Sequence, residues 1–199
     1  MSTTLLPITV IAAILIFFVK ELLEYVRSKK KKSKKLAVYK RMIAEEIEIN
    51  KTALGSLSQT LSTIRDGTDE RNRIPRIIRT PSGALRIEFK EDDEDYGSGW
   101  PIPPISKAVF EKLYLELAEL DPSFFEESAR TYEAVAEIKH IRDSLIDYIE
   151  EDTLRPNGFL NSFAEWGEGQ LEHSKSALSD LYFKCTGKQL ERGRLRSFA

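Results

Sequence analysis

The first hydrophobic pattern along the chain is a long apolar run close to the N-terminus. Between residues 5 and 19 every side chain is apolar except that of Thr9. On a helical wheel these positions lie on all sides, which is typical of a helix surrounded by lipid and not of one lying on a membrane surface. Such a run spans only ~22 Å, so a ~30 Å hydrocarbon core would also need the apolar positions between residues 22 and 26. The pattern predicts one N-terminal transmembrane anchor over residues 1–26.

A cleaved signal peptide and a buried core helix are the two other interpretations of this run. A signal peptide usually carries a Lys or Arg before its apolar region and a small-x-small cleavage site after it. Neither feature is found before the basic residues that follow the run. We therefore favour an uncleaved anchor.

Basic residues cluster after the apolar run, and none precedes it. Basic flanks stay on the cytoplasmic side of a membrane, so the N-terminus is expected outside and the rest of the chain in the cytoplasm. This polybasic neck, residues 27–41, either only sets the topology or also contacts anionic lipid, at about 1 kcal/mol for each basic side chain near the surface. The residues expected at the lipid headgroups are Arg27, Lys29, Lys30, Lys31, Lys32, Lys34 and Lys35.

A heptad pattern follows over residues 42–66, where apolar residues recur in alternating steps of three and four. The same phase runs back into the neck, so anchor and stalk are predicted to form one continuous helix that ends at Gly67. The stripe fits a parallel coiled coil between copies of the chain, and it fits equally one helix of an intramolecular bundle. The members of this self-association seam are Ile43, Ile47, Asn50, Leu54, Leu57, Leu61 and Ile64.

Residues 67–105 interrupt the helical pattern. Two partly alternating stretches, 76–80 and 84–89, flank Pro81-Ser82-Gly83 and predict a small β-hairpin in an otherwise irregular, charged linker. Four arginines between residues 71 and 79 fit a phosphate or nucleic-acid contact, but we favour their neutralisation by nearby acids, which include a run of five.

The end of this linker is rich in glycine and proline. Residues 96–104 predict a stiffening linker, in which glycines give freedom and the three prolines that follow favour extended polyproline II. Such a segment can serve as a docking peptide for an aromatic groove. The favoured alternative is a strap that Trp100 and Ile102 fasten to the bundle.

Helical periodicity returns over residues 106–187. Ser106 is placed to cap a first helix that reaches Leu120. Asp121-Pro122 then starts a second helix, because a capping acid followed by proline at the first helical position is a strong start signal. A third helix ends at Cys185-Thr186-Gly187. Each helix has one apolar face that must be buried against another. We therefore predict a mainly α fold, a single transmembrane helix followed by a cytoplasmic bundle of about four helices.

Charge is distributed unevenly along the 199 residues. Residues 1–41 hold ten basic and two acidic residues, a net +8, whereas residues 42–183 sum to −14 and residues 184–199 to +4, which leaves a formal charge of −2. A basic tail, residues 188–199, either contacts anionic lipid or nucleic acid or, as we favour, folds over the acidic body. The single cysteine excludes an internal disulfide framework.

Catalytic or metal-binding chemistry has little support in the sequence. Glu137 and His140 form a Glu-x-x-His pair like those of di-iron bundles, yet the matching position before His173 is Gln170, so half of that constellation is missing. The nearby lysines would lower the pKa of the Cys185 thiol, and a tail folded back to the membrane would allow its acylation, but a quiet, half-buried thiol is favoured. We expect that the protein is not an enzyme and that it binds no cofactor.

The function hypothesis is a membrane-tethered cytoplasmic helical adaptor or scaffold that binds an unknown cytoplasmic protein or further copies of itself. The alternative is a membrane-surface sensor that binds anionic lipid through its basic neck and tail. A small membrane-bound enzyme or effector is a third and weaker hypothesis, and nucleic acid is not a favoured partner.

Overall fold

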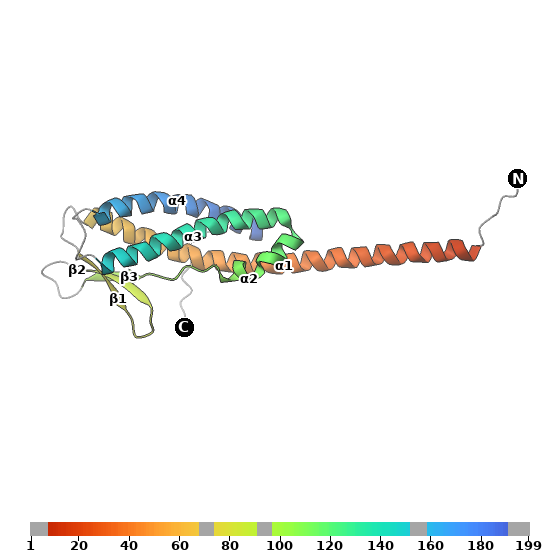
Figure 1. The fold of residues 1–199 in the computed structure, drawn as a ribbon, viewed down its shortest axis with the longest axis horizontal. Helices are drawn as coiled ribbons and strands as arrows, with labels where there is room; N and C mark the ends of the chain where they lie inside the picture. Colours follow the sequence, from red (N-terminus) through yellow and green to blue (C-terminus); the bar gives the residue numbers. More distant parts are fainter. Residues whose placement is uncertain (1–7, 68–73, 91–96, 152–158, 191–199) are drawn as a thin grey trace.

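The computed structural model describes residues 8–67, 74–90, 97–151 and 159–190, and within them the chain is mainly helical (Figure 1). The first residues of the predicted anchor, the acidic run 91–95 and the tail residues 191–199 lie outside this description. The elements are α1 (Ile8–Gly67), β1 (Ile74–Arg79), β2 (Leu85–Lys90), β3 (Ser98–Pro101), α2 (Ala108–Leu120), α3 (Pro122–Glu150) and α4 (Phe159–Thr186).

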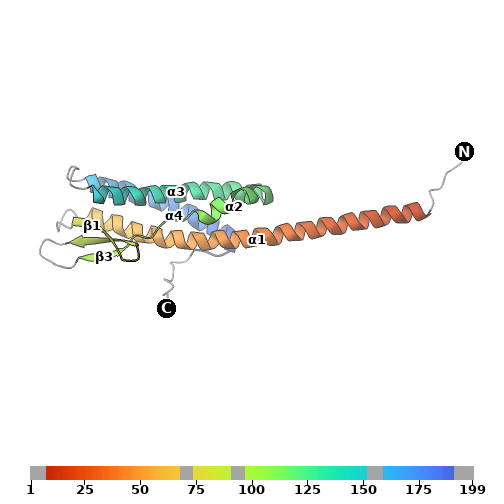
Figure 2. The same cartoon turned by 60° about the horizontal axis from the view of Figure 1, so that its bottom comes forward.

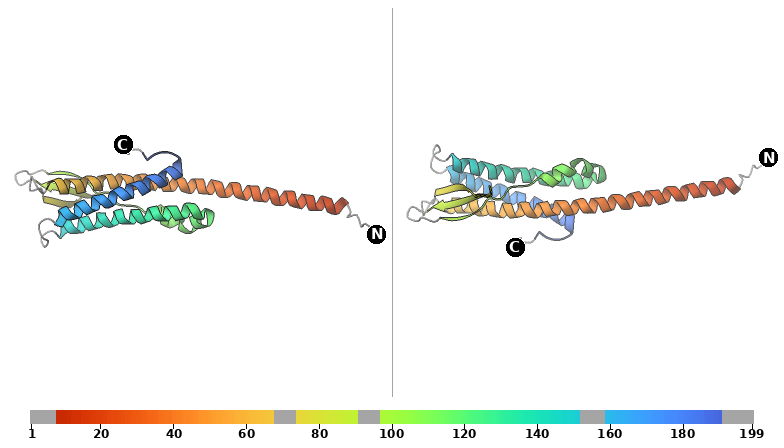
Figure 3. Two further views of the ribbon diagram at one scale, coloured as in Figure 1. Left: turned by 90° about the horizontal axis from the view of Figure 1, so that it is seen from above. Right: turned by 90° about the horizontal axis from the view of Figure 1, so that it is seen from below.

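Helix α1 is a single continuous helix of 60 residues, as the heptad phase predicted. At ~1.5 Å per residue it is ~90 Å long. Its N-terminal half projects from the rest of the molecule without another element beside it, in every view (Figures 1, 2 and 3). Among the described residues, none of the helices combines the length and the apolar character needed to cross a membrane.

The C-terminal half of α1, together with the other elements, forms the body of the molecule. Helices α3 and α4 lie along α1, whereas α2 lies at the end of the body nearest the projection and the sheet lies at the opposite end (Figures 1 and 3). One continuous hydrophobic core joins α1, α2, α3, α4 and β2. The prediction of a helical bundle is confirmed.

Gly167 marks the place where α4 crosses the other two long helices. A Cβ atom at this position would lie 3.0 Å from Cδ1 of Leu61 in α1 and 3.4 Å from Cγ2 of Ile141 in α3. The absence of a side chain therefore lets the backbone of α4 pack directly against Leu61 and Ile141, and α4 continues through this point as one helix.

The predicted hairpin is present. Strands β1 and β2 pair antiparallel with Ile77 opposite Ile87. The turn between them contains Gly83 at φ 81°, a left-handed conformation that glycine adopts at no steric cost. Ile87 and Phe89 are buried and join the sheet to the core of the body.

The linker predicted over residues 96–104 contains an element that the sequence did not predict, because Ser98–Pro101 forms a third strand paired with β2. Gly99 permits this pairing. A Cβ atom there would lie 2.6 Å from the carbonyl oxygen of Ile87, closer than a side chain allows. The strand depends on contact with β2, which a local pattern does not reveal.

Residues 100–107 form a strap that bridges α1 and α3. Ile102 is buried, and the indole N–H of Trp100 donates to Oγ1 of Thr60 at 2.7 Å. On the other side, Nε of Arg142 donates to the carbonyl oxygen of Pro103 at 2.9 Å. The predicted role of Trp100 and Ile102 in fastening the strap is confirmed.

The two predicted helix starts have different outcomes. Asp121 caps α3 as expected, since its Oδ1 accepts a hydrogen bond from the N–H of Phe124 at 3.0 Å. Helix α2 begins at Ala108, and the hydroxyl of Ser106 lies 3.4 Å from the N–H of Ala108, which is a weak contact. The main cap of α2 comes instead from Glu46 of α1, whose carboxylate accepts hydrogen bonds from the N–H groups of Val109 and Phe110.

Candidate functional site

The most unusual surface is the projecting part of α1, whose large apolar side chains are exposed. Their exposed fractions range from 38% for Val10 to 71% for Ile16. Soluble surfaces rarely expose so many contiguous apolar side chains, and a patch of this kind marks a contact with lipid or with another protein. The exposed residues are Val10, Ile11, Ile14, Leu15, Ile16, Phe17, Phe18, Val19, Leu22, Leu23, Tyr25 and Val26.

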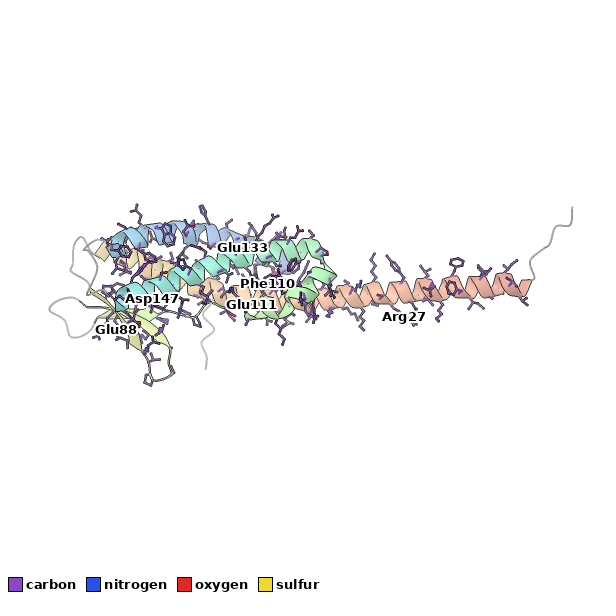
Figure 4. All side chains as sticks on the ribbon, viewed as in Figure 1. Arg27, Glu88, Phe110, Glu111, Glu133 and Asp147 are labelled. Carbon is purple, nitrogen blue, oxygen red and sulfur yellow. The ribbon has the colours of Figure 1, made fainter. Side chains whose placement is uncertain are left out.

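Six basic residues follow directly on this apolar segment, and all are exposed. Four of them, from Lys29 to Lys32, are consecutive, so successive side chains leave the helix ~100° apart and surround it. Within the described part of the chain none of the six is paired with a carboxylate. Figure 4 shows Arg27 on the projection, away from the body. This collar consists of Arg27, Lys29, Lys30, Lys31, Lys32 and Lys34.

Lys35, the seventh residue predicted at the headgroups, differs from the collar because it contacts the body. Its Nζ lies 2.5 Å from Oε2 of Glu116 in α2, and the hydroxyl of Tyr39 donates to the same carboxylate oxygen. The hydrogen bond to Glu116 raises the pKa of Lys35, and the reciprocal bond lowers the pKa of Glu116. The ion pair therefore keeps both groups charged over a wide pH range.

The joint between projection and body includes one further basic residue. The ammonium group of Lys40 lies 4.6 Å from the ring centroid of Phe124 in α3, a distance suited to a cation–π contact. Lys35, Tyr39 and Lys40 together fix one side of α1 to the corner where α2 meets α3. The direction of the projection relative to the body is set at this corner.

Inside the body, Glu46 of α1 lies at the start of α2 and is only 2% exposed. Its Oε1 accepts hydrogen bonds from the hydroxyl of Ser106 at 2.6 Å and from the N–H of Val109 at 3.0 Å. Its Oε2 accepts from the N–H of Phe110 at 3.2 Å and from the hydroxyl of Tyr132 at 2.5 Å. A carboxylate suits the positive end of a helix, so α1 caps α2 across the core.

The sequence prediction did not include Glu46, although one signal was present. Glu46 and Asn50 are four residues apart and lie on the same helical face, within the apolar stripe. Asn50 is fully buried, and its side chain exchanges two hydrogen bonds with the backbone of Ser106, at 2.7 and 2.8 Å. Two polar residues within one apolar stripe indicate that this part of the stripe faces the backbone N–H and C=O groups of another segment.

All members of the predicted seam are buried inside the body of one chain. This burial corresponds to the second alternative for the stripe, in which it packs as one helix of an intramolecular bundle. A coiled coil between copies through the same face would require these contacts to open, and that association remains a prediction. The residues concerned are Ile43, Ile47, Asn50, Leu54, Leu57, Leu61 and Ile64.

The weak metal candidates do not assemble into a site. Glu137 is half-buried, whereas His140 and His173 are exposed. Within the described ranges, no three His, Cys, Asp or Glu side chains lie close enough to hold a metal ion.

Cys185 is a half-buried thiol near the end of α4. Burial raises its pKa to about 12, and the nearby charge of Lys40 offsets only part of that effect. Lys184, which the sequence suggested as an activating neighbour, forms an ion pair with Glu127 of α3. The structure therefore favours the quiet thiol over a reactive one.

Comparison of the chain with protein-family models, curated protein sequences and solved structures finds no match. The candidate function therefore depends on the surfaces of the chain itself. Three of them stand out, namely the apolar projection, the collar that follows it and the acidic body.

Proposed function

We propose that the protein is a membrane-tethered helical adaptor, anchored by its apolar N-terminal segment with the body in the cytoplasm. The observation that carries this proposal is the uncovered apolar surface of α1 followed at once by the collar. Burying apolar side chains in lipid is favourable at roughly 25 cal/mol per Å². Basic side chains resist transfer through the bilayer, so the collar and everything after it would remain on the cytoplasmic side.

The length of the anchor is compatible with a locally thinned bilayer. The uncharged run of residues 5–19 covers ~22 Å of a ~30 Å core. Leu22 and Leu23 extend the apolar surface, and Lys20, which pairs with Glu24 at 3.9 Å, has a side chain long enough to reach the headgroups. A short hydrophobic segment is accommodated by thinning of the bilayer at modest cost.

The body is the part that would meet a partner. Residues 42–183 carry a net charge of −14, and an anionic membrane surface repels them. From Val26 to Lys35 the helix rises ~13 Å, so the body would stand clear of the headgroups. Glu133 and Asp147 are exposed on α3 (Figure 4) and carry no ion pair within the described residues. We propose that this acidic surface binds a cytoplasmic protein with a basic docking face, or another copy of the chain.

Membrane fractionation of the full chain tests the anchor. The protein is expected in the membrane fraction and resistant to alkaline carbonate extraction. Replacing Ile14 and Phe18 with lysine should release it, because each charge in the hydrocarbon region costs several kcal/mol. The matched control is Leu115→Lys on α2, which is 73% exposed on the body and should leave the protein in the membrane fraction.

Orientation is tested by protease treatment of intact cells. A tag at the N-terminus should be removed from outside, whereas a C-terminal tag should be protected. A wild-type chain in the soluble fraction, or a body digested from outside, would contradict the proposal.

The adaptor role is tested by cross-linking the full chain in its membrane. A specific partner should be lost when Glu133 and Asp147 are replaced by Gln and Asn, and it should be lost at high salt, since exposed charges are screened. A partner profile that is unaffected by both changes would contradict the acidic surface as the docking site.

A further inference from the structure

The collar on the projecting part of α1 is a surface whose charge and position indicate the chemical class of its ligand. The collar residues Arg27 to Lys34 occupy the ~10 Å of helix immediately beyond Val26, the last exposed apolar residue of the projection. When the apolar segment lies in a bilayer, this length coincides with the headgroup layer and its immediate water. The side chains point in all directions around the helix, so each faces lipid headgroups and not a second protein element.

We propose that the collar binds the anionic headgroups of phospholipids and that Glu116 withholds Lys35 from that contact. The proposal rests on the proposed membrane anchor. Basic side chains next to a membrane attract anionic lipid with about a fivefold gain for each side chain.

A lipid surface fits the collar better than a nucleic acid does. Proteins that bind nucleic acid gather their basic residues on one face or in one groove, often with aromatic side chains between the charges. Between Arg27 and Lys34 the chain has no aromatic residue, and the charges surround a single helix. A ring of headgroups around an inserted helix matches this arrangement.

Lys35 follows Lys34 directly but has a different environment. Its ammonium group is held 2.5 Å from the carboxylate of Glu116, which also accepts the hydroxyl of Tyr39. Lys35 would have to leave this carboxylate before it could bind a headgroup. The side chain is half exposed, at 47%, so no steric barrier prevents its release when Glu116 loses its charge.

The structure thus predicts different effects on anionic-lipid binding for substitutions of the two partners of one ion pair. Lys35→Gln should leave anionic-lipid binding unchanged, because the side chain does not contribute to it. Glu116→Gln should increase that binding by up to about fivefold, because one more basic side chain becomes available. Glu119→Gln is the matched control, since Glu119 is exposed on the same helix and has no ion pair in the described ranges.

The experiment uses the full chain in phosphatidylcholine nanodiscs that contain phosphatidylserine. A donor fluorophore is attached at Ser33→Cys in a Cys185→Ala background, and energy transfer is measured to acyl-labelled phosphatidylserine and, separately, to acyl-labelled phosphatidylcholine. Wild type should transfer several-fold more to phosphatidylserine, and this preference should disappear when all six collar residues are replaced by Gln or when salt is raised.

Each part of the proposal would be overturned by a different result of this experiment. Equal transfer to both lipids would overturn the collar proposal and leave the anchor intact. Absence of transfer to either lipid would instead overturn the anchor. A preference that falls with Lys35→Gln, or one that does not rise with Glu116→Gln, would overturn the withholding role of Glu116. Tight binding of an RNA oligonucleotide to discs without anionic lipid would show nucleic acid to be the ligand.

Discussion

Tyr132 of α3 donates its hydroxyl proton to Glu46 of α1, with 2.5 Å between the two oxygens, inside a core where Glu46 is almost inaccessible to solvent. Burial, and then the hydrogen bond to Glu46, raise the pKa of Tyr132 well above its ordinary value. The raised pKa keeps the hydroxyl protonated, and therefore a donor, above the pH at which an exposed tyrosine ionises. Because Glu46 also accepts two N–H groups of α2, this carboxylate holds three helices together.

Replacing Glu46 with Gln should lower the free energy of unfolding of the full chain by about 2–4 kcal/mol. The NH₂ group of the amide would replace one carboxylate oxygen and would face groups that are themselves hydrogen-bond donors. Urea unfolding in detergent, followed by circular dichroism, measures the change. Glu45→Gln is the control, since the neighbouring Glu45 is exposed and, among the described residues, pairs with Arg41 alone, so its loss should cost about 0.5 kcal/mol or less. Equal effects at the two positions would contradict the capping role of Glu46.

The strap makes a second prediction through Thr60, whose side chain is fully buried and accepts the indole N–H of Trp100. Thr60→Val keeps the shape but removes the acceptor, so the free energy of unfolding should fall by about 1–3 kcal/mol. Thr63→Val is the comparison, because within the part of the chain that the structure describes the Thr63 hydroxyl bonds to the carbonyl oxygen of Gln59 in the same helix and to no other element. If Thr63→Val destabilises the chain as much, the strap contributes little.

Local signals in the sequence were sufficient for several elements of the fold. The continuous α1, the turn at Gly83 and the cap at Asp121 each depend on residues close together in the chain. Strand β3 and the cap by Glu46 depend on contacts between distant residues, and a glutamate in a helix is usually exposed. The collar was predicted from its run of charge, but the partner of Lys35, Glu116, is 81 residues away and leaves no local pattern.

Two glycines of α4 give a third, paired prediction. Gly169 faces open space, so Gly169→Leu should stabilise the helix by up to about 1 kcal/mol through higher helix propensity. Gly167 contacts Leu61 and Ile141, and Gly167→Leu should destabilise the body by about 1–3 kcal/mol through overpacking. Thermal unfolding of both variants measures the difference. Similar melting temperatures would contradict the close crossing of α4 over α1 and α3.

Cys185 gives a prediction about pH. Alkylation by iodoacetamide requires the thiolate, and burial raises the pKa of this thiol to about 12, whereas an unfolded cysteine ionises near ~8.5. At pH 8.5 the folded chain should therefore react on the order of a thousandfold more slowly than the chain in urea. Its rate should rise about tenfold per pH unit up to pH ~10, while the rate in urea levels off above pH ~9. Mass spectrometry of the labelled chain follows both. A folded chain whose rate also levels off near pH 9 would show that Cys185 is accessible and ionises as an ordinary thiol, which would contradict its burial between α4 and the rest of the body.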